Sequence, residues 1–174
     1  MSASTLLFLT VRALHVLLAA AWLGSTAFLS LFVLPSLDEA GPAGSTVMAA
    51  MGRRRVDPFF ASIGGTTVLT GLWLYWRFTS GFDRVASATM AARLFGAGGL
   101  AGILALIIAG SIVGRTARKM IALASKEAAS TDSTQRAALQ TEIAGATRRI
   151  STYSKIVLVL QVVALVCMAI GHYV

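Results

Sequence analysis

Four long apolar stretches alternate with more polar segments along the chain. They cover residues of about 6–34, 59–76, 94–114 and 156–173, and the first stretch stops at Pro35. A helix needs about 20 predominantly apolar residues to cross the hydrocarbon core of a bilayer. The pattern therefore predicts four membrane-spanning helices that pack as an all-α integral membrane four-helix bundle.

The segment between the last two stretches, 115–155, is polar but keeps a helical repeat. Its apolar positions Leu139, Ile143, Ala146 and Ile150 share one helix face. A Thr/Asp/Ser cluster ahead of them is typical of a helix start. We therefore expect the third and fourth helices to continue past the membrane and to pair as a cytoplasmic helical hairpin. The chain, 1–174, is then a single transmembrane domain.

Composition agrees with a membrane protein. Of 174 residues, 56% are hydrophobic and 13% are charged, and the mean hydropathy is +0.77, well above that of ordinary soluble domains. A single cysteine, Cys167, excludes an internal disulfide framework. The first stretch is also longer than the apolar part of a secretory signal peptide and has no basic region before it, so we expect it to be a membrane helix.

The distribution of Lys and Arg predicts the orientation. Eleven of them lie in the connections after the first and third stretches, and four lie on the other side. Cytoplasmic loops carry the excess of positive charge, so both termini are expected outside. The net charge of +8 is explained by a basic face that meets anionic lipid headgroups, and no nucleic-acid partner is expected.

Small residues predict how the helices pack. In lipid, close helix contacts depend on Gly, Ala, Ser and Thr at the interface. The third stretch contains Gly98 and Gly102 as a GxxxG pair, and the second contains Gly64, Thr67 and Gly71 at helical spacing. We expect both sets to face neighbouring helices of the bundle.

His15 is the most informative residue of the first stretch. On a helix it shares a face with Ala19, Trp22 and Thr26, and this face is smaller and more polar than the surrounding Leu and Phe surface. His15 is therefore expected to point inward. An ionisable group at membrane depth is costly without a partner and is a functional candidate. The alternative is a structural hydrogen bond to a neighbouring helix.

The other histidine, His172, is expected at the same outer boundary. Met168 lies one turn before it on the fourth helix, on the same face. Two imidazoles that face each other across a bundle commonly hold a b-type haem, whereas His with Met or Cys suits copper(I). The alternative for His172 is an interfacial residue beside Tyr173 in the headgroup zone.

Three further residues are candidates for cofactor contact. Arg12 lies one turn before His15, and Arg93 begins the third stretch. Each is either an interface anchor or a partner for a haem propionate. Trp22, which shares the His15 face, is the third candidate.

Three segments resemble a known group of proteins. "LHVLLAAAWLGSTAF", "TTVLTGLWLYWRF" and "AARLFGAGGLAG" are similar to small bacterial membrane proteins around the copper-resistance D family and, more distantly, to the membrane-embedded bacterial protoporphyrinogen oxidases. The resemblance implies a location in the bacterial cytoplasmic (inner) membrane and a haem-binding role for His15. In those oxidases a lysine that begins the third helix is required. Arg93 occupies that place here, so whether the chain is an enzyme is left open.

Two functions follow from these observations. The first is a haem- or copper-binding protein that handles electrons or metal at the outer face, with His15, His172 and Met168 as ligands. The second is a cofactor-free accessory subunit that packs against a larger membrane complex or forms a homodimer. Hydrolytic motifs are missing from the sequence, and no acidic residue falls inside the four stretches.

Overall fold

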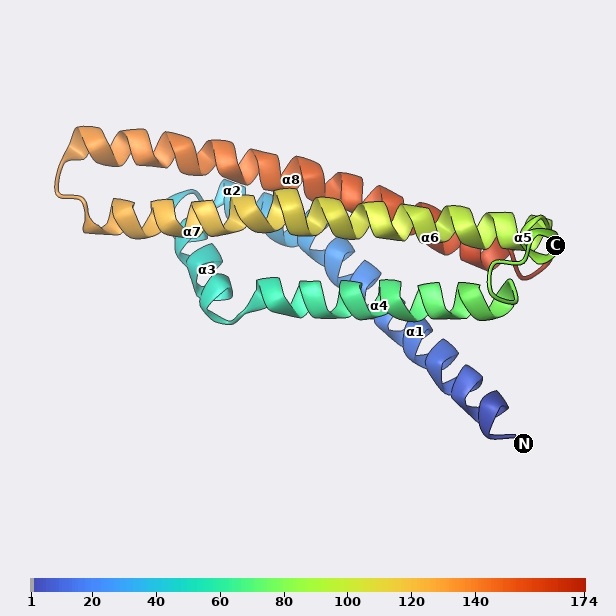
Figure 1. The fold of residues 1–174 in the computed structure, drawn as a ribbon. Helices are drawn as coiled ribbons and strands as arrows, with labels where there is room; N and C mark the ends of the chain where they lie inside the picture. Colours follow the sequence, from blue (N-terminus) through green and yellow to red (C-terminus); the bar gives the residue numbers. More distant parts are fainter. Residues whose placement is uncertain (1) are drawn as a thin grey trace.

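The computed structural model describes residues 2–174, and the side chains of all of these except Pro42, Ser45 and Ala49. Every regular element in this range is a helix, which confirms the all-α expectation. Both termini lie at the same end of the molecule, opposite the turn between α7 and α8 (Figure 1).

The first helical rod is longer than the sequence suggests. It consists of α1 (Ala3–Phe28), a π-helical turn at Leu29–Val33 and α2 (Leu34–Glu39). The prediction that the helix stops at Pro35 is wrong. Proline lacks an N–H and normally breaks a helix interior. Here it falls in the first turn after the π-helical turn, where the wider register has already rearranged the backbone hydrogen bonds.

Two shorter helices and one long helix follow. α3 (Pro42–Arg53) leads into α4 (Val56–Phe78) through Arg55, whose φ of 58° is left-handed. α4 packs against both α1 and α6. The four-residue helix α5 (Arg84–Ser87) then connects α4 to the second rod.

The second rod and the last helix form the predicted hairpin. α6 (Met90–Ile108), a second π-helical turn (Ala109–Val113) and α7 (Gly114–Ala129) run continuously. α8 (Ser133–Ile170) returns alongside α7 and α6 over its whole length (Figure 1). The side chain of Asp132 caps α8 by accepting a hydrogen bond from the backbone N–H of Thr134, at 2.9 Å.

Three of the described helical rods are long and apolar enough to cross a membrane: Ala3–Glu39, Met90–Ala129 and Ser133–Ile170. α4, although it has 23 residues, is not one of them. The fold is therefore that of an α-helical multi-pass membrane protein. The count of three differs from the four expected spans.

The interior has two apolar clusters. The first lies inside the hairpin and at its base, and it joins Met120 and Leu123 of α7 to Ile143 and Ile150 of α8. The second joins all four long helices through Trp22, Ile63, Ala105 and Val157. The helical repeat read from residues 139–150 is thus confirmed as a buried face.

The small residues divide into packed and open positions. A Cβ at Gly98 would meet the Ala164 carbonyl oxygen at 3.1 Å, so α6 and α8 approach closely there. A Cβ at Gly102 would meet nothing within 4 Å. The expectation of close packing is confirmed for Gly98, and at Gly102 no neighbouring helix approaches closely enough to touch a Cβ.

Candidate functional site

His15 is held against α4 by two polar groups. Its Nδ1 lies 2.9 Å from the backbone oxygen of Thr67 and 3.1 Å from Oγ1 of Thr70. A carbonyl oxygen only accepts, so Nδ1 carries the proton and donates to Thr67. In the neutral ring this leaves the lone pair on Nε2, which is the usual state of a metal-ligating histidine.

Gly71 explains how the imidazole reaches this position. A Cβ at residue 71 would lie 2.8 Å from Cε1 of His15, closer than real side chains approach. The ring therefore rests directly on the backbone of α4. The sequence predicted that His15 and Gly71 both face the bundle, and the structure adds that they face each other.

His172 lies at the same end of the bundle. Its Nε2 is 2.6 Å from a terminal guanidinium nitrogen of Arg12, and its Nδ1 is 3.0 Å from the backbone oxygen of Met168. Nδ1 donates to the carbonyl, so Nε2 accepts from Arg12. The Phe95 and His172 rings also pack in a T-shaped arrangement, with the centroids 5.3 Å apart. Because Arg12 lies one turn before His15 on α1, the structure brings both histidine regions together.

The other predicted residues occupy different environments. Trp22 is 4% exposed and packs where Gly64 lets α4 approach, with 3.0 Å between its ring and a Cβ at that glycine. It lies about 10 Å along α1 from His15. Met168 packs its terminal methyl group against Gly98 of α6. Arg93 is exposed in the first turn of α6.

The soft ligand groups at this end are the two imidazoles, the Met168 thioether and the thiol of Cys167, which lies beside Met168 against Gly98. Among the described residues, no group of three or more His, Cys, Asp or Glu side chains lies together. An axial haem site needs only one or two such ligands, and linear or trigonal copper(I) uses His and Met. The free Nε2 of His15 therefore fits either group.

Sequence reasoning missed the residues that position His15. Thr67 was predicted as a packing residue, but its carbonyl oxygen is the hydrogen-bond acceptor. Any residue type supplies a carbonyl, so side-chain chemistry gives no signal for it. Thr70 directly precedes Gly71, and its polarity on an inward helix face was the available signal.

The fold and composition define an α-helical multi-pass membrane protein with a histidine clamped inside the bundle. Comparisons with models of protein families, with curated proteins and with solved structures found no match.

Proposed function

We propose that this chain is a membrane-embedded haem- or copper-binding protein in which His15 is the principal ligand. The observation that carries the proposal is the hydrogen bond from Nδ1 of His15 to the Thr67 carbonyl at 2.9 Å. Metal-ligating histidines typically donate their second nitrogen to such an acceptor, which fixes the tautomer and the ring orientation. A bound haem or copper ion would supply one-electron chemistry.

Arg12 and His172 have linked roles in this proposal. Arg12 donates to the same nitrogen of His172 that would coordinate a metal. An anionic group such as a haem propionate would draw the guanidinium away and free that nitrogen. His172 is then the second imidazole ligand of a haem, and Met168 with His15 is the alternative set for copper(I). Arg93 is a second candidate partner for a propionate.

The topology belongs to the same proposal. α4 crosses the membrane as a fourth span, both termini face outward, and the α7–α8 hairpin lies in the cytoplasm. His15 and His172 then lie at the outer end of the bundle, in the cytoplasmic membrane of a bacterium. Electron or metal handling at the outer face, as the likeness to the copper-resistance D group implies, is consistent with this placement.

The test is an absorption spectrum of the gently purified protein, oxidised and then reduced with dithionite. For haem we expect a Soret band that is lost in His15→Ala and restored in part by added imidazole, which enters the space of the missing ring. For copper we expect a copper(I) titration that saturates at one ion and is lost in the same variant. His172→Ala shows whether His172 is the second ligand.

A matched control separates loss of a ligand from loss of fold. Thr10→Ala removes an exposed hydroxyl of α1 that bonds only to its own helix, and it should leave the spectrum and the titration unchanged. A folded protein that binds neither haem nor copper(I), or that binds them equally well in His15→Ala, would show that the proposal is wrong.

One observation favours the second function, a cofactor-free accessory subunit. Gly24, Gly65, Gly99 and Gly102 lie in the long helices, and a Cβ at any of them meets nothing within 4 Å. Open glycines on apolar helices allow another helix to approach closely. If this function is correct, a larger membrane protein copurifies with the chain, and Gly99→Leu releases it.

A further inference from the structure

A cavity lies in the half of the bundle that is away from His15. It has a volume of about 300 Å³, within the range of small-ligand pockets, and lies between α1, α4, α7 and α8. Its apolar wall includes Trp22, Phe60, Leu106 and Val157. This half of the molecule carries none of the residues assigned to the proposed haem or copper site except Trp22.

Both π-helical turns border this cavity. Leu29 and Ser30 line it from the first turn, and Ala109, Gly110 and Val113 line it from the second. π-helical turns are rare insertions that occur frequently at functional sites. Because both long helical rods contain a π-helical turn at the cavity wall, the cavity is part of the fold and not a chance gap in packing.

One polar side chain in the wall of the cavity has no partner. Ser30 is 0% exposed, and its hydroxyl makes no hydrogen bond with any of the described residues. Serines at such positions in helices usually bond the carbonyl four residues earlier, as Ser25 does with Ala21. A buried hydroxyl without a partner is costly, so it points to a ligand that accepts its hydrogen bond.

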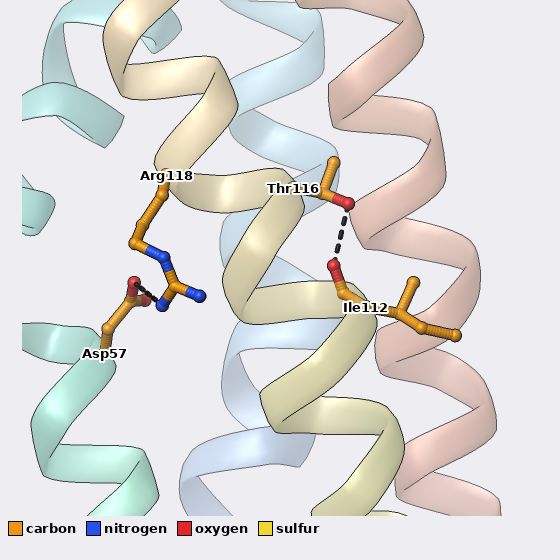
Figure 2. Close-up of polar contacts among 4 residues, drawn as sticks. All are labelled: Asp57, Ile112, Thr116 and Arg118. Atoms are coloured by element: carbon orange, nitrogen blue, oxygen red, sulfur yellow. Dashed lines mark hydrogen bonds and ion pairs between the residues drawn. The ribbon is translucent and has the colours of Figure 1, made fainter.

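The rim of the cavity carries a cation in a loose ion pair. Arg118 of α7 reaches toward Asp57 of α4, with 3.9 Å between the charged atoms (Figure 2). The Arg118 side chain is 62% exposed. The neighbouring turn between α3 and α4 adds Arg53, Arg54 and Arg55. The charge around this end therefore favours an anion.

Ser30 and Asp57 lie toward one end of the cavity, and the apolar residues around Trp22 lie toward the other. Ser30 lies about 12 Å beyond Trp22 on the first rod. Asp57 likewise precedes Ile63, the α4 residue packed with Trp22, by six positions. A ligand with an anionic head at Ser30 and Arg118 would thus place an apolar chain toward Trp22.

We propose that this cavity binds one acyl chain of an anionic amphiphile, whose carboxylate or phosphate is held by Arg118 and by the Ser30 hydroxyl. The carboxylate of Asp57 competes with the ligand for Arg118. Burial raises the pKa of Asp57, and the attraction of Arg118 opposes this. Removing the negative charge of Asp57 should therefore strengthen binding.

The test uses quenching of tryptophan fluorescence, because Trp22 lines the cavity. Dibromostearate is the probe, and its uncharged methyl ester is the comparison. The full-length protein is used in detergent, with Trp22→Phe subtracted to remove the signal of Trp73 and Trp76. We expect saturable quenching by the acid and much weaker quenching by the ester. Arg118→Gln should weaken binding about tenfold or more, and Asp57→Asn should tighten it.

Matched variants test the position of the chain. Gly110 lines the cavity, and a Cβ there meets nothing within 4 Å, so the side chain of Gly110→Leu should occupy cavity space and abolish binding. A Cβ at Gly99 also meets nothing within 4 Å, but Gly99 does not line the cavity, so Gly99→Leu is the matched control. Lys119→Gln removes a neighbouring cation that pairs with Glu142 at 3.5 Å. Both controls should bind normally.

A second measurement identifies the source of the amphiphile. Nanodiscs that contain brominated phosphatidylglycerol are compared with nanodiscs that contain brominated phosphatidylcholine. Saturable quenching by the anionic lipid alone assigns the site to a phospholipid, and quenching by dibromostearate alone assigns it to a free fatty acid. Equal quenching by charged and uncharged probes, or normal binding in both Arg118→Gln and Gly110→Leu, would overturn the proposal.

Discussion

Replacing Gly71 with alanine tests the contact that positions His15. The added Cβ would lie 2.8 Å from Cε1 and 3.4 Å from Nδ1 of the imidazole. The ring must move, which lengthens the bond from Nδ1 to the Thr67 oxygen. Overpacking of this kind costs about 1–3 kcal/mol. Alanine also returns about 0.5–1 kcal/mol through its better helix propensity. We expect a net loss of about 0–2.5 kcal/mol in the free energy of unfolding, and a loss of about 1–3 kcal/mol relative to a Gly→Ala change without this contact.

The measurement is unfolding in mixed micelles, followed by circular dichroism, with Gly65→Ala as the control. Gly65 lies in the same helix, and a Cβ there meets nothing within 4 Å, so this change should be neutral or slightly stabilising. In the background His15→Ala the ring is gone, and Gly71→Ala should lose its penalty. If Gly71→Ala is as stable as Gly65→Ala, or if the penalty persists without the imidazole, the contact does not restrain the ring.

Three further predictions concern the other half of the molecule. Asp57 precedes the apolar 59–76 segment and has a pKa above its ordinary value because of burial. The carboxyl group therefore loses its proton at lower pH in the unfolded chain than in the folded chain. The free energy of unfolding should fall as the pH rises from 3.8 through the raised pKa of the folded state. Asp57→Asn should remove this pH dependence from unfolding measured across that range. Ile143→Ala should cost about 2–4 kcal/mol in unfolding experiments, because its side chain is buried between α7 and α8. Asp132→Ala should remove a helix cap worth about 1 kcal/mol and speed hydrogen exchange at the Thr134 amide.

Periodicity predicted the elements whose burial follows from one helix face. Ile143 and Ile150 are buried, as the helical repeat predicts. Trp22 and Thr26, which share the predicted inward face of His15, are buried as well. These predictions succeed because side chains three and four residues apart necessarily share a side of a helix. The hairpin follows from the same rule, combined with the short polar turn before Ser133.

The sequence did not predict the π-helical turn before Pro35, the rotation of α6 against α8, or the contact between Arg12 and His172. Pro35 is a helix breaker in isolation, and only the π-helical turn before it lets the rod continue to Glu39. Gly98 and Gly102 are indistinguishable as a motif, yet α8 covers only the first, because one helix contacts a neighbour along a narrow strip. The contact of Arg12 with His172 joins residues 160 positions apart, and no local pattern encodes it.

The apolar layer around Trp22 separates two polar regions. Ala105 and Val157 in this layer are 0% and 3% exposed, so both side chains are fully packed. His15 and Ser30 lie on opposite sides of it, about 22 Å apart along the first rod. Sites that distant, with no shared partners, usually contribute independently. His15→Ala and Arg118→Gln should therefore have effects on unfolding that add within about 0.5 kcal/mol. An anionic chain bound beside Trp22 should likewise leave ligand binding at His15 unchanged. A large coupling would mean that the Trp22 layer moves when either region is occupied.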